Sequence, residues 1–193
     1  MSSSLDIIVP FEFSDTELRG LIAIEPEVFE DKRGLFMETY KRAAFEDAGI
    51  DVGFIQDNCS KSKSNVLRGL HYQKGDAAQA KIVQCTEGTV FDVVVDLKKE
   101  SPTFGEYSST ILSEENNMML YVPRDYAHGF LTLSDTAKVR YKVDNDYTPD
   151  REGGIIWDDP TVAIDWPSDD PILSEKDMNW PTLETAIEND LVF

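Results

Sequence analysis

Histidine and cysteine are scarce in this chain, which has 193 residues and two of each. Cys59 and Cys85 form no CxxC pair, and a chain of this length can bury a core without a disulfide, so we expect two reduced thiols. No apolar run approaches the roughly 20 residues that cross a bilayer. The first residues also lack the basic and apolar regions of a secretory signal. These absences favour a soluble, cytoplasmic protein with no membrane partner.

Several catalytic signatures are missing as well. The sequence has no GxGxxG or GKS/GKT loop for nucleotide cofactors and no GxSxG nucleophile elbow. A metal site in a β-barrel commonly begins with an H-x-H pair and needs three or four ligands, whereas His71 is followed by Tyr72 and Gln73. The other histidine, His128, is distant in sequence. We therefore expect no metal, and proton transfer by side chains is the chemistry that remains.

Positive charge is also in short supply. Lys and Arg number 18 against 37 Asp and Glu, which gives a net charge of −19 and argues strongly against nucleic acid as a partner. The stretch from Asn58 to Gln84 runs the other way, with five basic residues and one acid, Asp76. Such a stretch is either a solvated hairpin or a site for an anionic ligand, and charge alone favours neither.

Linkers rich in Pro, Gly or Ser and internal repeats are absent too, so we expect one domain, residues 1–193. Short β-rich runs separated by turn residues predict strands at 21–24, 52–56, 66–72, 81–85, 89–97, 108–112, 118–122, 129–133 and 138–144. Helical patterns occur at 40–49, where Gly49 would end the helix, and at 181–190. Central strands with short flanking helices indicate an all-β, antiparallel jelly roll.

Strand alternation indicates which side chains share a face, because residues two apart point the same way. It groups Lys81 with Val83 and Cys85, His128 with Phe130 and Thr132, and Tyr141 with Val139 and Val143. Each set places one polar residue among apolar or small ones, as the floor of an enclosed pocket requires. A core position is the alternative for each polar residue, and alternation by itself favours that alternative for Tyr141.

The segment NVLRGLHYQ, residues 65–73, breaks this parity rule. Arg68 and His71 are three apart, so a regular strand would point them to opposite faces. Gly69 lies between them, and glycines inside strands often mark β-bulges. A bulge there would turn both side chains to one face, where the arginine could hold an anion beside the imidazole.

Eight segments, in order along nearly the whole chain, resemble the dTDP-4-dehydrorhamnose 3,5-epimerase family. They are EDKRGLFMETY, FIQDNCSKSKSNVLRGLHYQ, AKIVQC, GTVFDVVVDLKKESPTFGEY, YVPRDYAHGFLTLSD, VRYKVDNDYTP, GGIIWDDPTVAIDWP and LSEKD. The resemblance implies a cupin-type jelly roll that forms a homodimer with shared active sites. It also implies epimerisation of a dTDP-4-keto-6-deoxy sugar at C3 and C5 without metal or other cofactor. Residues of about 1–50 would contribute to the dimer, and those of about 150–193 would pack on the barrel.

The resemblance assigns catalytic roles to four residues. His71 of the LRGLHYQ block would remove the protons at C3 and C5, and Asp177 of SEKD would orient it. Lys81 of AKIV would stabilise the enolate at the C4 oxygen, and Tyr141 of VRYK would protonate C5 from the opposite face.

The remaining site residues follow from the same blocks. His128 and Asp92 would form a second, supporting pair. The nucleotide and diphosphate would be held by Arg33, Glu38, Gln56, Asn58, Ser60, Arg68 and Tyr147, with Arg33 reaching in from the partner subunit.

Other functions stay open at this point. One is a related enzyme, either an epimerase that acts only at C3 or C5 or a 3,4-ketoisomerase. Another is a jelly roll that binds a nucleotide sugar without turning it over. The chain also departs from the family pattern at Asp125 and Tyr126, where glycine and phenylalanine are common, and Asp125 would face either solvent or the rim of the pocket.

Overall fold

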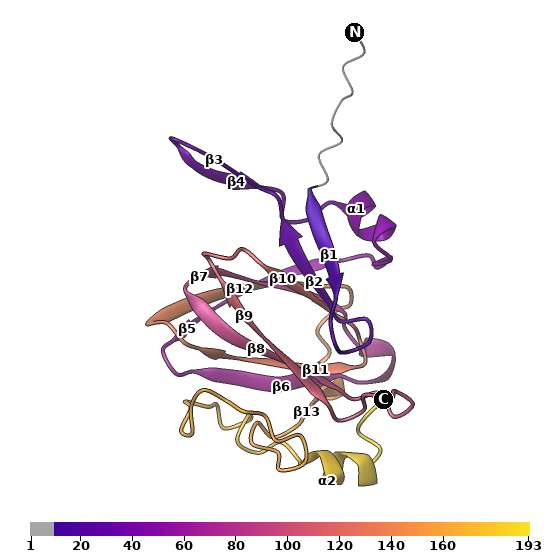
Figure 1. Cartoon of the computed structure of the whole chain (residues 1–193). Helices are drawn as coiled ribbons and strands as arrows, with labels where there is room; N and C mark the ends of the chain where they lie inside the picture. Colours follow the sequence, from indigo (N-terminus) through magenta and orange to yellow (C-terminus); the bar gives the residue numbers. More distant parts are fainter. Residues whose placement is uncertain (1–9) are drawn as a thin grey trace.

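Two antiparallel β-sheets face each other across a common interior, as the computed structural model of the chain shows for residues 10–193 (Figure 1). The first sheet has the strand order β1 (Phe11–Asp15), β2 (Ile22–Pro26), β10 (Met119–Val122), β7 (Lys81–Glu87), β12 (Thr136–Val143) and β5 (Gln56–Lys63). The second has the order β13 (Glu152–Gly154), β6 (Leu67–Gln73), β11 (Tyr126–Thr132), β8 (Thr89–Asp96) and β9 (Tyr107–Ser113). The predicted antiparallel jelly roll is confirmed.

The remaining elements are short. Strands β3 (Val28–Asp31) and β4 (Gly34–Met37) form a hairpin that projects away from both sheets in Figure 1. The helices are α1 (Arg42–Asp47) and α2 (Leu183–Glu188), and the 3-10 turns are η1 (Gly75–Ala77) and η2 (Pro149–Arg151). No helix within residues 10–193 is long and apolar enough to cross a membrane.

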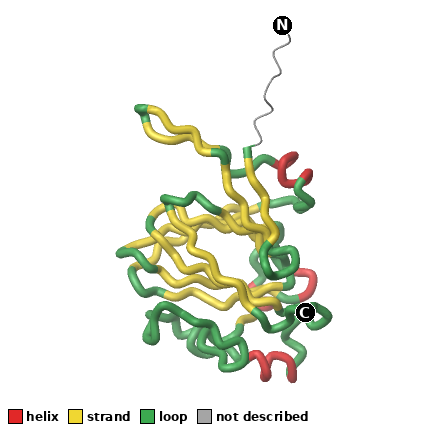
Figure 2. The backbone as a smooth tube through the Cα atoms, viewed as in Figure 1, coloured by secondary structure: helices red, strands yellow, loops and turns green. Residues whose placement is uncertain are grey.

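Three apolar clusters hold this arrangement together. Val83, Val94 and Phe130 belong to the cluster between the two sheets. The outer face of the first sheet packs against α1 through Phe45, and the outer face of the second packs against the C-terminal segment through residues such as Trp166. Figure 2 shows that this C-terminal covering is almost entirely loop. Both sheets are therefore buried on two faces over much of their area, while the cluster between them leaves room for a cavity.

Most strands and both helices fall where the sequence pattern predicts them, but the strand at 52–56 is wrong. Residues 51–55 have no regular structure, and Val52 and Phe54 instead pack on the apolar cluster beneath α1. The strand begins at Gln56 and continues through a polar run to Lys63. One face of that run meets solvent and the other meets a polar cavity, so it carries no apolar alternation by which a strand could be recognised.

The predicted β-bulge at Gly69 is confirmed. His71 pairs with His128 and Arg68 with Phe130, so β6 has one residue more than β11 over this interval. Both Arg68 and His71 consequently line the same cavity. Gly69 has a φ of +149°, and a Cβ there would lie 2.6 Å from the Cα of Gly129. The two backbones approach so closely that only glycine fits.

We expect Gly69→Ala to lower the free energy of unfolding by about 2 kcal/mol, because the new methyl group must push two strand backbones apart. Gly53→Ala is the control, since a Cβ at Gly53 meets no atom of residues 10–193 within 4 Å. Urea denaturation of the two variants measures the difference. Equal midpoints for both would contradict the assigned role of the close approach.

Candidate active site

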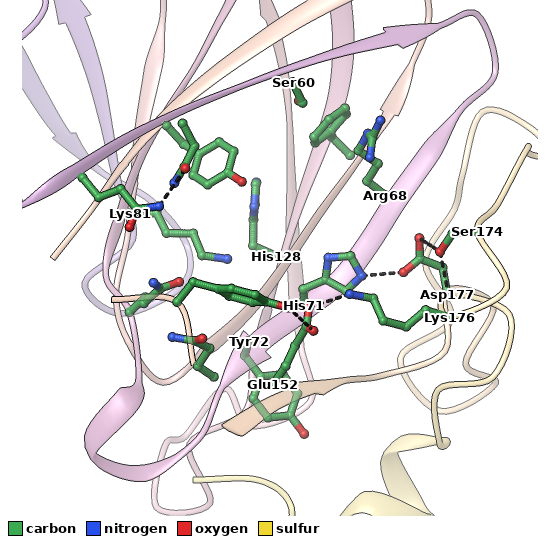
Figure 3. Close-up of a pocket in the computed structure, with 17 residues that line it drawn as sticks. Ser60, Arg68, His71, Tyr72, Lys81, His128, Glu152, Ser174, Lys176 and Asp177 are labelled. Carbon is green, nitrogen blue, oxygen red and sulfur yellow. Dashed lines mark hydrogen bonds and ion pairs between the residues drawn. The ribbon is translucent and has the colours of Figure 1, made fainter. Parts of the chain in front are cut away.

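A cavity of about 710 Å³ opens between the two sheets (Figure 3). Ten of the residues predicted from the sequence line it: Gln56, Asn58, Ser60, Arg68, His71, Lys81, His128, Tyr141, Tyr147 and Asp177. They come from strands of both sheets, from the loop after β12 and from the C-terminal segment. The fold thus brings together side chains that are more than a hundred residues apart in sequence.

His71 and Asp177 form a hydrogen-bonded pair on one wall of the cavity. Nε2 of the imidazole lies 2.5 Å from Oδ1 of the carboxylate. The hydroxyl of Ser174 donates to the other carboxylate oxygen at 2.8 Å. Burial acts to raise the pKa of Asp177, but the hydrogen bonds from His71 and Ser174 outweigh it and hold the pKa below its ordinary value. The carboxylate is therefore ionised at neutral pH and fixes the ring of His71.

Lys81 reaches the cavity from β7, in the opposite sheet. Burial lowers the pKa of this lysine to about 8, while the charge of Asp92 acts in the raising direction. At pH 7 the ammonium form still predominates. Lys81 is consequently a partly buried cation whose pKa lies close to neutral pH, and its ammonium group can meet a developing negative charge.

A second histidine–carboxylate pair lies deeper in the wall. Nε2 of His128 is 2.8 Å from Oδ2 of Asp92, whose side chain is fully buried. His128 faces the cavity, whereas Asp92 stands behind it and is not part of the lining. The pair joins neighbouring strands β11 and β8, where His128 is two residues from the position paired with Asp92.

Tyr141 faces the cavity from β12, so it approaches from the sheet opposite to that of His71. Burial raises the pKa of its phenol, with the positive charge of Arg68 acting against that shift. The hydroxyl is therefore protonated at neutral pH and can act as an acid. A base on one wall and an acid on the other suit a proton exchange across two faces of one ligand.

Side chains of β5 and β6 form a polar end of the cavity. Gln56, Asn58 and Ser60 alternate along β5, and the amide of Gln56 donates to Asn58 at 2.8 Å. The buried hydroxyl of Ser60 has no hydrogen-bond partner in the part of the chain that the structure describes. Nε of Arg68 donates to the hydroxyl of Ser62 at 3.0 Å, and the guanidinium forms no ion pair among the described residues. These groups have donors and acceptors free for a polar, anionic ligand.

Two residues of the cavity lining that the sequence did not predict, Lys176 and Glu152, form a network with the predicted Tyr147. Nζ of Lys176 lies 2.7 Å from Oε1 of Glu152, and the hydroxyl of Tyr147 donates to Oε2 at 2.9 Å. These bonds hold the pKa of Glu152 below its ordinary value although burial acts to raise it. Lys176 and Ser174 lie inside the SEKD block and could have been found there. Glu152 begins the three-residue strand β13, which is too short to show any periodicity.

Two predicted binding residues lie outside this cavity. Arg33 is at the turn of the β3–β4 hairpin, where its side chain is 84% exposed and pairs with Asp31. Glu38 follows the same hairpin, and one of its carboxylate oxygens is buried with no hydrogen-bond partner among the described residues. Asp125 forms an ion pair with Lys98 and does not line the cavity. Within residues 10–193, no three His, Cys, Asp or Glu side chains gather to hold a metal ion.

Known proteins are similar to this chain in sequence and in fold. The sequence profile of the dTDP-4-dehydrorhamnose 3,5-epimerase family matches residues 15–185. The chain is 50% identical to the protein of that name from Salmonella typhimurium over 174 residues, which covers 89% of this chain and 95% of the relative.

Solved structures of related epimerases have a fold similar to that of this chain. The epimerase of Legionella pneumophila, in complex with dTDP-4-keto-L-rhamnose, is 41% identical with a TM-score of 0.90 and covers 94% of this chain and 97% of its own. A 3'-monoepimerase from Streptomyces bikiniensis, in complex with dTDP-quinovose, is 36% identical with a TM-score of 0.88, over 92% of this chain and 90% of its own.

We expect the ε-ammonium of Lys81 to titrate with a midpoint of about 8, because burial disfavours its charged form. NMR of the protein with 13C-labelled lysine measures this midpoint directly. Asp92→Asn should move the midpoint lower still, since it removes a negative charge that favours the ammonium. A midpoint near the ordinary value of about 10.4 would contradict the buried placement of this group.

Proposed function

The chain belongs to the dTDP-4-dehydrorhamnose 3,5-epimerase family, and from this premise we propose how its cavity converts dTDP-4-dehydro-6-deoxy-D-glucose to dTDP-4-dehydro-L-rhamnose. The proposal is proton abstraction and return at C3 and C5 through an enolate, by side chains alone. The observation that carries it is the histidine–carboxylate pair of His71 and Asp177 on one wall, facing Lys81 and Tyr141 from the other sheet.

His71 is the proposed base for both positions. The C4 ketone acidifies the hydrogens on C3 and on C5, so one base serves both if the sugar shifts between the two steps. Because Nε2 is bonded to Asp177, the neutral ring carries its proton there and keeps Nδ1 free to accept one. The carboxylate then stabilises the imidazolium that forms.

Lys81 is the proposed partner of the enolate oxygen. Removing a proton beside the ketone places negative charge on the C4 oxygen, and a preorganised donor meets that charge without rearrangement. Losing one such donor typically costs ~3 to 4 kcal/mol of barrier. His128, held by Asp92, supports the opposite wall, the one that also carries His71.

Tyr141 is the proposed acid at C5. Inversion requires that the proton return to the face opposite to the one it left, and Tyr141 stands on the sheet opposite to His71. Its phenol is protonated at neutral pH, since burial raises its pKa. The hydroxyl can therefore give a proton to the enolate and recover it from solvent afterwards.

The diphosphate and nucleoside are assigned to the polar end of the cavity. Arg68 provides a guanidinium that forms no ion pair within residues 10–193, and such a fork can bind the diphosphate by two hydrogen bonds. Gln56, Asn58 and Ser60 offer amide and hydroxyl groups to the base and sugar. Tyr147, which is 55% exposed at the edge of the cavity, offers an aromatic face.

A second copy of the chain is the proposed partner. The β3–β4 hairpin projects from the body and exposes Phe29, Leu35 and Phe36, the last of them 67% exposed (Figure 1). Exposed apolar side chains in one hairpin are typical of an interface. A homodimer that covers them would carry Arg33 and Glu38 toward the cavity of the partner, where this chain's own copies do not reach.

We also propose that the enzyme is cytoplasmic, acts as one domain over residues 1–193, and has neither nucleic acid nor membrane as a partner. The charge of −19 supports the exclusion of nucleic acid. In this organisation the N-terminal residues serve the dimer, and the C-terminal residues support the wall that carries Asp177.

A single-position epimerase is the second candidate, because the solved relatives include a 3'-monoepimerase. Tyr141 in the cavity favours reaction at C5 as well. A jelly roll that only binds nucleotide sugars is less well supported, since binding alone needs neither a lysine with a lowered pKa nor a histidine fixed by a carboxylate.

We expect the wild-type protein, incubated with dTDP-4-dehydro-6-deoxy-D-glucose in D2O, to incorporate deuterium at both C3 and C5. Proton abstraction must exchange these hydrogens with solvent, and 1H NMR measures each position separately. His71→Asn should abolish exchange at both positions. Tyr141→Phe should keep exchange at C3 and lower the rate of inversion at C5 by at least ~100-fold, as expected for removal of a general acid.

Other outcomes would contradict the proposal in different ways. Label at one position in the wild type makes it a single-position epimerase, and label at neither position rejects proton transfer. Full epimerisation at C5 by Tyr141→Phe would reject the assigned acid.

We expect a dimer in sedimentation velocity and a shared site in a mixing experiment. Arg33→Ala and His71→Asn should each be impaired alone, but co-expressed hybrids should regain activity. In a hybrid, the subunit with intact His71 receives intact Arg33 from its partner. A monomer, or a hybrid no more active than the Arg33→Ala protein, would contradict sharing.

A further inference from the structure

Both oxygens of the Asp177 carboxylate have a defined partner. Oδ1 faces His71 at 2.5 Å, and Oδ2 accepts a hydrogen bond from the hydroxyl of Ser174 at 2.8 Å. The same hydroxyl oxygen accepts from the backbone N–H of Asp177 at 3.1 Å. Figure 3 shows Ser174 beside the carboxylate, on the side away from the imidazole. One hydroxyl therefore fixes both the backbone and the side chain of Asp177.

The carboxylate depends on such partners because it is buried. Its side chain is only 4% exposed. A buried carboxylate without donors is costly and tends to take up a proton. Ser174 supplies a donor to the oxygen that His71 does not use, so the carboxylate stays ionised while Oδ1 remains aimed at the ring.

The loop that carries both residues is anchored to the strand that carries His71. The backbone N–H of Leu67 donates to Ile172 at 3.0 Å, and the N–H of Ile172 donates to Asn65 at 2.7 Å. Ser174 follows Ile172 by two residues. The position of the Ser174 hydroxyl is thus fixed relative to β6, and its hydrogen bonds fix the position of Asp177 relative to the same strand.

We propose that Ser174 is a positioning residue for proton abstraction: it holds Asp177 in the orientation and ionisation state that make His71 an effective base. The inference deepens the proposed function and rests on it. Ser174 acts through Asp177, so it should change the chemical step and its pH dependence while leaving substrate affinity largely unchanged.

We expect Ser174→Ala to lower kcat about ten- to thirtyfold at C3 and C5 alike, the effect of losing one hydrogen bond to a charged group. KM should stay within twofold. The acid-side limb of kcat should move to higher pH. Ser174 is one of the donors that hold the pKa of the Asp177 carboxyl below its ordinary value, so without it the pair of Asp177 and His71 keeps its proton up to a higher pH.

Three variants serve as controls. Ser174→Thr keeps the hydroxyl and should restore kcat and the pH limb. Ser168→Ala removes a hydroxyl outside the cavity that accepts a hydrogen bond from the N–H of Asp170, and it should change nothing. Ser174→Ala added to Asp177→Asn should lower kcat less than twofold further, since the residue it positions is already neutral.

Several results would overturn the inference. They are an unchanged kcat and pH limb in Ser174→Ala, a loss of KM alone, no rescue by threonine, or a full additional loss on top of Asp177→Asn. Thermal unfolding of each variant separates these effects from misfolding. If His71→Asn abolishes exchange while Ser174→Ala behaves as wild type, only this inference fails. If His71→Asn retains exchange, the proposed function itself fails.

Discussion

One barrel interior has to be an apolar core and a polar cavity at once, and the rest of the structure follows from that constraint. Individual strands meet both demands, because one part of each strand faces the cavity and another part packs in the apolar core. On β7, Lys81 faces the cavity while Val83 and Cys85 join the core. On β12, Tyr141 lies next to the cavity and Val139 is buried in the core. The apolar part of each strand fixes its place in the sheet, and the polar end can then be rigid without contributing to stability itself.

The histidine–carboxylate pair shows how distant segments are made to meet. His71 lies on an inner strand, but Asp177 follows it by 106 residues and arrives from the C-terminal segment over the outer face of the second sheet. Two backbone hydrogen bonds hold this segment in place. The N–H of Leu67 donates to Ile172, and the N–H of Ile172 donates to Asn65. The outer cluster is thus more than cover for the sheet, because its packing determines where the carboxylate stands relative to the base.

The sequence predicted the site best where the alternation of side chains along a single strand was informative. Arg68 and His71 are three residues apart and can share a face only through an irregularity, and the glycine between them indicated where the bulge lies before any partner strand was known. It failed for β5, whose polar residues face solvent on one side and the cavity on the other. The meeting of Asp177 with His71 came only from resemblance, since the path of a mostly irregular C-terminal segment leaves no periodic signal.

Positive charge at the cavity contrasts with the negative net charge of the chain. The chain carries −19 overall, so a nucleotide diphosphate is repelled by the surface as a whole. On the outer faces of β5 and β12, Lys61 and Lys138 both pair with Glu87. Arg68 and Lys81, by contrast, form no ion pair within the described part of the chain, and both face the cavity. Positive charge left unneutralised in a cleft of low dielectric acts strongly over short distances. The same cations that would hold the diphosphate and the enolate therefore also offset the field that an acidic surface imposes on an anionic substrate.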